Sequence, residues 1–160
     1  MLGVDILILV TLGTQKQPFT RLLDKIEHSN IKDEIVVQAG HTKYTSNKMQ
    51  IFDFIDYETM ENLIKKADIV ITHGGTGSIV GPLSKEKKVI ALPRLQKYGE
   101  HVDNHQTEII EAFSKMDYIL ELKEEDDIDR VVADIQKFQP KLYVSNTDNF
   151  IEKLKQEIEK

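Results

Sequence analysis

Residues 68–78 read DIVITHGGTGS, and this stretch decides the fold. Asp68 to Thr72 is a short apolar run of the kind found in strands that are buried on both faces. The glycine-rich HGGTGS follows at once, and Ile79, Val80 and Leu83 then recur at helical spacing. The stretch therefore predicts a strand, a glycine loop and the start of a helix.

The same alternation continues on both sides of this stretch. Further strands are predicted at Asp5 to Leu12, Glu34 to Ala39, Gln50 to Ile55, Lys88 to Leu92 and Tyr118 to Leu122. Helices are predicted at Phe19 to Ile26, Met60 to Ala67, Gly75 to Lys85, Asn104 to Met116 and Asp126 to Phe138. This order is typical of α/β proteins with a doubly wound, Rossmann-like parallel sheet, here of about six strands, with helices on both faces.

The size and composition suit one globular domain, because the chain has 160 residues, 40% of them hydrophobic and 30% charged. We expect this domain to span residues 1–146, and residues 147–160 to form an amphipathic helix that packs on the domain or docks on a partner. The absence of cysteine excludes disulfides and cysteine nucleophiles, and no metal site is predicted. A net charge of −6 argues against a nucleic-acid binder, and no apolar run is long enough to span a bilayer.

Ligands of doubly wound sheets bind beyond the carboxyl ends of the strands, so the segments that follow the predicted strands form the candidate site. Polar and glycine residues gather in these segments: LGTQ (12–15), AGHTKY (39–44), DYET (56–59), HGGTGS (73–78) and PRLQKYGEHVDNHQ (93–106). Glycines let backbone N–H groups approach an anion, and the first turn of a helix favours negative charge. A diphosphate fits the chemistry of HGGTGS.

Side chains of the glycine segment add hydrogen-bond donors to this prediction. Thr76 and Ser78 each carry a hydroxyl, and His73 could donate a ring N–H or carry positive charge. The plainer interpretation is that the glycines form a tight connection and that Ser78 caps the helix. ATP and nicotinamide chemistry are disfavoured, because Ser78 stands where a Walker A lysine is needed and the third glycine of the dinucleotide motif is missing.

Together with its neighbours, the glycine turn resembles the C-terminal, donor-binding domain of the MurG-like glycosyltransferases of the GT-B type. The segments that carry the resemblance follow the family's order: VTLGT (10–14), FIDY (54–57), THGGTGS (72–78) and DNHQ (103–106). The chain is most similar to small cytosolic subunits whose N-terminal half is a separate membrane-anchored polypeptide. Examples are the bipartite GlcNAc transferase of dolichol-linked oligosaccharide synthesis and the PssE-like subunits of bacterial polysaccharide assembly, and LPRLQKYGEHVDNHQ (92–106) favours the latter.

The resemblance implies a role for each segment. The diphosphate is expected at Gly13, Thr14, His73, Gly74, Gly75, Thr76, Gly77 and Ser78, with His73 also a candidate for stabilising the leaving group. Uracil is expected at Phe54 and Ile55, through the backbone of Ile55. The sugar hydroxyls are expected at Asn104, His105 and Gln106, with Arg94, Glu100 and His101 as further candidates. The plainer interpretation of DNHQ is a helix cap by Asp103 or Asn104.

One position departs from the family's pattern. Many relatives carry a Glu after the glycine loop that binds the ribose hydroxyls, and Gly81 stands there in this chain. Ribose recognition is therefore expected from another group, such as the backbone or a partner.

The implied reaction moves a sugar from a UDP-sugar to a lipid-linked saccharide acceptor in capsule or exopolysaccharide synthesis, with no cofactor besides the substrate. The catalytic base is expected in a membrane-anchored, acceptor-binding partner subunit, so none is assigned here, and the chain alone should be weak or inactive. We expect a cytoplasmic location, at the inner face of the membrane through that partner. The alternatives are a non-enzymatic nucleotide-binding regulatory subunit on the same fold and a self-sufficient small enzyme or flavodoxin-like module.

Overall fold

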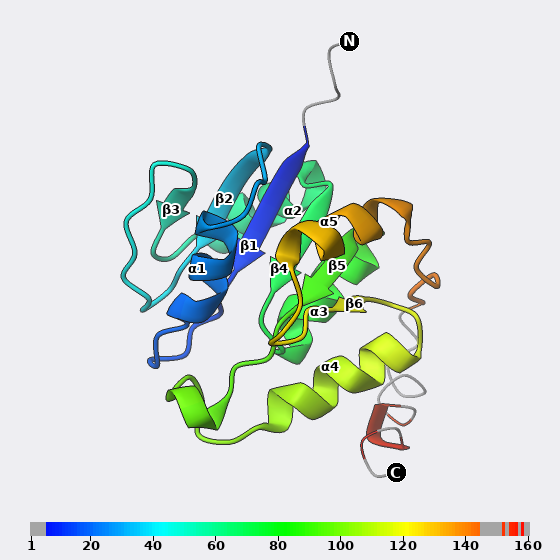
Figure 1. Ribbon diagram of the computed structural model, residues 1–160. Coiled ribbons are helices and arrows are strands. Elements are labelled where there is room, and N and C mark those ends of the chain that lie inside the picture. Colours follow the sequence, from blue (N-terminus) through cyan, green and yellow to red (C-terminus); the bar gives the residue numbers. More distant parts are fainter. Residues whose placement is uncertain (1–5, 145–151, 153, 157, 159–160) are drawn as a thin grey trace.

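The computed structural model describes residues 6–144, 152, 154–156 and 158. Its strands form one sheet in the order β3-β2-β1-β4-β5-β6, and every neighbouring pair is parallel (Figure 1). The strands are β1 (Leu7–Thr11), β2 (Glu34–Gln38), β3 (Gln50–Phe52), β4 (Ile69–Thr72), β5 (Lys88–Ala91) and β6 (Leu120–Glu121). The predicted doubly wound parallel sheet is confirmed.

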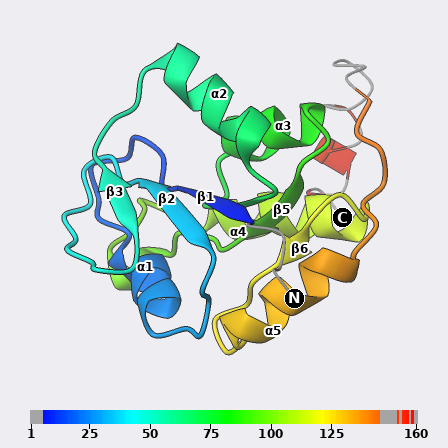
Figure 2. The ribbon, with the colours of Figure 1, turned by 90° about the horizontal axis from the view of Figure 1, so that it is seen from above.

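The helices cover both faces of the sheet. They are α1 (Thr20–Glu27), α2 (Tyr57–Lys66), α3 (Thr76–Ser84), α4 (His105–Lys115) and α5 (Ile128–Lys137), with a short 3-10 turn η1 (Gln96–Tyr98). Figure 2 shows α2 and α3 on one side of the sheet and α1 and α5 on the other. Helix α4 packs in the same core cluster as α2 and α3.

The two sides of β1 explain why the predicted strands lack a polar face. Ile8 and Val10 are buried in the cluster with α1 and α5, and Leu9 is buried in the cluster with α2, α3 and α4. Because successive side chains of a strand point to opposite faces, a central strand that is covered twice must be apolar throughout. The sheet core therefore lies in two layers, one on each side of β1 and β4.

The predicted strand Gln50 to Ile55 is too long, because β3 ends at Phe52. The chain leaves the sheet there and enters α2 earlier than predicted, at Tyr57, since the Asp56 carboxylate accepts a hydrogen bond from the N–H of Thr59 at 2.7 Å. This N-cap satisfies one of the free donors of the first helical turn. Phe54 and Ile55 consequently lie in the connection between β3 and α2 rather than in the sheet.

Most of the predicted C-terminal helix, residues 147–160, lies outside the described residues. Among those described, Leu154 is buried in the cluster with α2, α3 and α4, and Ile158 packs against it. No helix in the described part of the chain is long and apolar enough to cross a membrane.

Ile71, in the middle of β4, tests the sheet core, because its side chain is fully buried in the cluster with α1 and α5. Ile71→Ala should lower the free energy of unfolding by about 3 kcal/mol, through lost burial and the cavity left behind. Leu142→Ala is the control, since Leu142 is exposed and its truncation should change stability by less than about 0.5 kcal/mol. Urea unfolding that gives equal losses for both variants would contradict this arrangement of the core.

Candidate functional site

The strand order reverses between β1 and β4, the two central strands. Helix α1 follows β1 on one face and α3 follows β4 on the other, so the two connections diverge and leave a crevice at the carboxyl ends of these strands. Thr11 and Thr72 end the two strands as register partners, and the hydroxyl of Thr11 donates to that of Thr72 at 2.7 Å. This pair forms the floor between the two connections.

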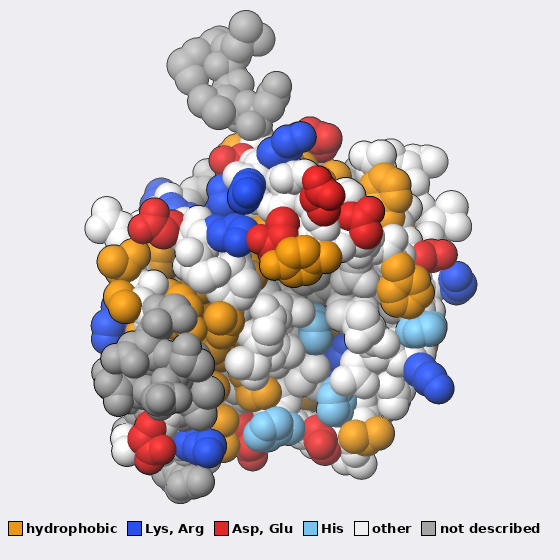
Figure 3. All heavy atoms as spheres, turned by 180° about the vertical axis from the view of Figure 1, so that it is seen from behind, with side chains coloured by type: hydrophobic (Ala, Val, Ile, Leu, Met, Phe, Trp, Pro, Cys, Tyr) orange, Lys and Arg blue, Asp and Glu red, His pale blue; other side chains and the backbone are white. Residues whose placement is uncertain are grey.

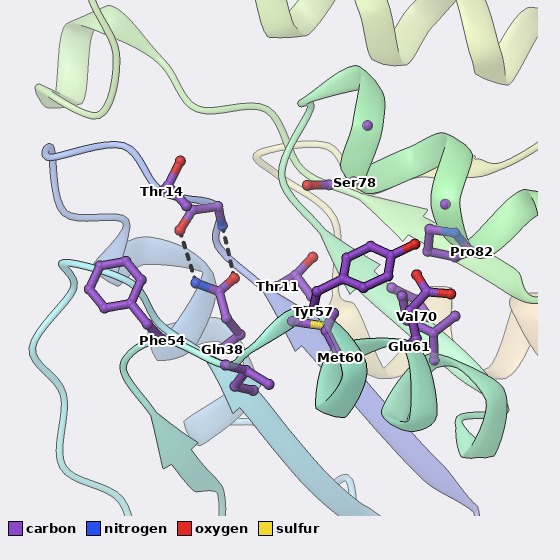
Figure 4. A pocket seen from close by; sticks show the side chains of 15 residues that line it. Thr11, Thr14, Gln38, Phe54, Tyr57, Met60, Glu61, Val70, Ser78 and Pro82 are labelled. Atoms are coloured by element: carbon purple, nitrogen blue, oxygen red, sulfur yellow. Dashed lines mark hydrogen bonds between the residues drawn. The ribbon is translucent and has the colours of Figure 1, made fainter.

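A cavity of about 300 Å³ lies at this point, between the loop after β1, the connection before α2, and the facing sides of α2 and α3. Its lining includes six of the residues predicted from the sequence, namely Gly13, Thr14, Phe54, Ile55, Gly77 and Ser78 (Figure 4). Seen from behind, this face of the molecule is hollowed, and histidine side chains gather toward the end to which the strands point (Figure 3). The predicted diphosphate and uracil segments therefore meet at one cavity.

His73 is buried behind this cavity and is held by three hydrogen bonds. Its Nδ1 accepts the N–H of Gly75 at 3.2 Å and the amide of Gln106 at 3.1 Å, so the ring proton lies on Nε2, which donates to the hydroxyl of Ser78 at 3.1 Å. Burial, reinforced by the charge of Arg94, lowers the pKa of His73 to about 4. The ring is therefore neutral near pH 7, which favours the predicted role of His73 as an N–H donor over that of a positive charge.

Packing requires three of the glycines, two of them against His73 and one against Gln106. A Cβ at Gly13 would lie 2.5 Å from Nε2 of His73, one at Gly75 would lie 2.5 Å from its Cε1, and one at Gly74 would lie 2.6 Å from Cβ of Gln106. Gly13 also has a φ of +79°, which disfavours other residues. The plainer interpretation, a tight connection, thus accounts for Gly74 and Gly75, but Ser78 is not the cap, because the N-cap of α3 is Gly75.

Gly77 and Gly81 are different, because a Cβ at either would meet no atom within 4 Å. Both lie on α3 and both line the cavity. A glycine inside a helix costs about 1 kcal/mol relative to alanine. At Gly81, packing within the described chain leaves room for a side chain, so it does not explain why the destabilising glycine is present.

The backbone N–H groups of the glycine segment fall into two groups, those that are bonded within the protein and those that are not. The N–H of Gly74 donates to Oε1 of Gln106 at 2.9 Å, and that of Gly75 donates to His73. The N–H groups of Thr76, Gly77 and Ser78, in the first turn of α3, have no acceptor within the described residues. The predicted cradle of Gly74 to Ser78 is therefore narrower than expected, since only these last three amides are free to face an anion.

Gln38 is a site residue that the sequence analysis missed. Its amide binds both sides of Gly13, accepting from the N–H at 3.2 Å and donating to the C=O at 3.0 Å (Figure 4). The signal was its place directly after the apolar run Ile35 to Val37 in a strand. A polar side chain that is buried there nearly always has a hydrogen-bond partner. Gln38 thus fixes the turn after β1 against β2.

Arg94 and Glu100, further candidates for the sugar, bind to the loops in this structure. Arg94 is 1% exposed and donates to the carbonyls of Leu12, Gln17 and Glu100 at 2.5–3.0 Å. The carboxylate of Glu100 is buried and accepts two hydrogen bonds from Arg21, at 2.9 and 3.1 Å. These buried groups join the loop after β5 to the loop after β1, so neither side chain faces the cavity.

Gln106 is also committed inside the protein. It is 4% exposed, its Oε1 accepts from the N–H groups of Gly74 and Arg94, and its Nε2 donates to His73. In this structure Gln106 braces the glycine segment against α4, and its role as a sugar contact stays a prediction.

The other predicted sugar residues lie around the start of α4, and none of them lines the cavity. The side chain of Asn104 accepts from the N–H of Gln96 at 2.9 Å, and the rings of His101 and His105 lie 3.1 and 3.0 Å from the carboxylates of Asp103 and Glu108. Asp103 accepts from the N–H of His105 at 2.9 Å, so the interpretation of DNHQ as a helix cap is right in part. His105 and Asn104 are exposed.

Gly75→Ala tests the packing around His73. The added methyl group should lower the free energy of unfolding by about 2 kcal/mol, because the buried ring cannot move aside without losing its hydrogen bonds. Gly81→Ala, inside the helix that Gly75 precedes, is the matched control and should instead stabilise the protein by about 1 kcal/mol. Thermal or urea unfolding distinguishes the two, and similar effects at both positions would refute the packing argument.

The protonation of His73 gives a second test. Nitrogen-15 spectra of the imidazoles should show the Nε2–H tautomer of His73 from about pH 8 to about pH 5. Because its pKa falls from 6.5 to about 4 on folding, the unfolded chain binds this proton more readily, so the stabilisation is complete above pH 6.5 and is lost as the pH falls toward 4. A His73 ring that titrates near pH 6.5 would contradict the buried network.

A family model for the glycosyltransferase family 28 C-terminal domain matches residues 7–160. Similar curated proteins include the UDP-N-acetylglucosamine transferase subunit ALG13 of Candida albicans, 29% identical over 96 residues, and that of Candida glabrata, 35% identical over 97 residues. The alignments cover 60% and 61% of this chain but only 31% and 41% of those proteins. The chain thus spans less than half the length of these relatives.

Solved structures support the same fold. The solution structure of ALG13 is similar with a TM-score of 0.64 and 19% identity over 98% of each chain. The crystal structure of MurG from Acinetobacter baumannii is similar with a TM-score of 0.53 and 16% identity, over 76% of this chain and 37% of that one. These likenesses confirm the predicted architecture of a GT-B C-terminal half. Together with the match over residues 7–160, they show that the chain belongs to the glycosyltransferase family 28 C-terminal domain family.

Proposed function

We propose that this chain binds the UDP-sugar donor of a two-part glycosyltransferase and stabilises the UDP leaving group. The observation that carries the proposal is the first turn of α3. The amides of Thr76, Gly77 and Ser78 are unpaired there within the described chain, and Gly77 and Ser78 line the cavity at the switch point. Such amides and the helix dipole stabilise a diphosphate. The stabilisation grows as the diphosphate gains negative charge while the sugar is transferred.

The hydroxyl of Ser78 supplements these amides. Its oxygen accepts the Nε2–H of His73, which leaves its own proton free to be donated to a phosphate oxygen. Hydrogen bonds in such a chain polarise one another, so a neutral histidine still contributes to leaving-group stabilisation through the serine. His73 is thus a positioning residue in this proposal, and Ser78 makes the contact.

The uracil end is assigned to the connection between β3 and α2. Phe54 is 55% exposed, and its ring meets that of His41 edge to face with 5.1 Å between centroids. The backbone N–H and C=O of Ile55 have no hydrogen-bond partner within the described residues. A flat apolar ring beside one free donor and one free acceptor suits a pyrimidine base.

In the proposed reaction, the bond between the sugar C1 and the diphosphate oxygen breaks as the acceptor hydroxyl oxygen bonds to C1. The acceptor proton passes to a base that we assign to a membrane-anchored, acceptor-binding partner, which would hold this chain at the cytoplasmic face of the membrane. The relatives named as UDP-N-acetylglucosamine transferase subunits support a subunit role and make UDP-GlcNAc the first donor to test. They lend no support to capsule or exopolysaccharide synthesis, so the acceptor is proposed only as a lipid-linked hydroxyl.

Calorimetry with UDP and UDP-GlcNAc tests the donor site. Gly77→Asp should weaken UDP binding at least about tenfold, because its carboxylate would compete with the phosphates while remaining compatible with the helix start. Thr20→Asp is the matched control, since Thr20 is an exposed residue in the first turn of α1, on the other face of the sheet. It should bind UDP as the unmodified chain does.

The donor site would be refuted if the unmodified chain did not bind UDP at about millimolar concentration. A dissociation constant of about 1 mM corresponds to roughly 4 kcal/mol of binding free energy. UDP binding without sugar transfer, in the presence of a co-expressed acceptor-binding partner, would favour the regulatory alternative.

A further inference from the structure

Among the described residues that line the cavity, Glu61 is the one that carries a carboxylate. It lies on α2, and its Oε2 is 2.7 Å from Nζ of Lys85, at the C-terminal end of α3. Both side chains are partly exposed, at 27% and 26%. Figure 4 shows the Glu61 side chain on the side of α2 that faces α3, beside Pro82. The ion pair therefore joins the two helices that enclose the cavity.

The surface of α3 in this cavity is largely bare backbone. Gly77 and Gly81 are one helical turn apart and both line the cavity, and a side chain at either would meet no protein atom within 4 Å. Space is thus kept open between the Gly81 backbone and α2, although nothing in the described packing requires glycine there.

We infer that Glu61 binds the ribose hydroxyls of the nucleotide, in the space that Gly81 leaves open. This inference rests on the proposed donor function. An ionised carboxylate has only hydrogen-bond acceptors, so it matches two neighbouring hydroxyls and repels phosphate oxygens. The cavity also contains the proposed uracil segment, Phe54 and Ile55, and the proposed diphosphate turn, Gly77 and Ser78. The ribose links those two groups in the ligand.

Lys85 makes this assignment electrostatically consistent. A lone carboxylate would oppose the binding of a nearby diphosphate, because like charges in a partly buried site interact strongly. The Lys85 ammonium neutralises Glu61 and occupies one of its oxygens, which leaves the other oxygen to accept from the ribose.

Binding of UDP and 2′-deoxy-UDP to the unmodified chain and to variants tests the inference. The unmodified chain should prefer UDP about tenfold, because the deoxy analogue leaves an acceptor without its hydroxyl. Glu61→Ala should weaken UDP binding by a similar factor and reduce the preference to less than about twofold, with Glu61→Gln intermediate. Glu58→Ala is the control, since Glu58 is an exposed carboxylate on the same helix that does not line the cavity. It should keep both the affinity and the preference.

Lys85→Met should weaken UDP and its deoxy analogue alike and so preserve the preference. Circular dichroism melts should show that all four variants are folded, because these side chains lie on helix surfaces. Equal binding of the two nucleotides by the unmodified chain, or an unchanged preference in Glu61→Ala, would overturn this inference and leave the donor site standing. A loss in Glu61→Ala that is confined to UDP-GlcNAc would overturn it in favour of a contact with the donated sugar. Absence of UDP binding would overturn both proposals.

Discussion

The imidazole of His73 occupies the space that side chains at Gly13 and Gly75 would need, and the carboxyl edge of the sheet is arranged around it. Its three hydrogen bonds connect β4, the glycine turn, the start of α3 and, through Gln106, helix α4. A buried imidazole is costly unless both ring nitrogens are paired. Because both are paired here, one side chain specifies the conformation of the turn and the direction of the Ser78 hydroxyl.

A second buried network holds the neighbouring loops in place. The guanidinium groups of Arg94 and Arg21 both contact the ring of Phe19, at 5.0 and 5.6 Å from its centroid, and the carboxylate of Glu100 pairs with Arg21. Burial lowers the pKa of Arg94 to about 10, and the charge of Glu100 opposes that shift. Removing either Arg21 or Glu100 would leave the other charge buried without its partner. The network therefore fixes the loops after β1 and β5, and of these two loops the one after β1 contributes Gly13 and Thr14 to the cavity lining.

This arrangement separates structural from ligand-facing groups within one short segment. Gly74 and Gly75 use their N–H groups to bind Gln106 and His73, whereas the next three amides are unpaired within the described chain, and two of these residues, Gly77 and Ser78, line the cavity. Preorganised donors of this kind need no rearrangement when negative charge develops on a leaving group, which is the main electrostatic contribution that a rigid site can make. The neutral state of His73 is consistent with this role, because a charged ring would require a partner in the core.

The order of strands and helices, the doubly wound fold and the glycine turn after β4 were all determined by local features of the sequence. Apolar runs, helical spacing and glycines act over a few residues, so they can be recognised without knowing which strands are neighbours. The boundary at Phe52 was missed because the Asp56 cap, which starts α2 early, competes with the apolar pattern of Gln50 to Ile55.

Tertiary structure alone decided which polar residues face the cavity. Gln38 bonds to Gly13, Gln106 to Gly74, and Arg94 to Leu12, and these pairs are 25, 32 and 82 residues apart in the chain. Each pairing follows from the order of the strands in the sheet, which brings their carboxyl ends together. The family resemblance placed Gln106 at the sugar and made Arg94 and Glu100 further candidates. A sequence shows that a side chain is polar but does not show the buried partner that satisfies it.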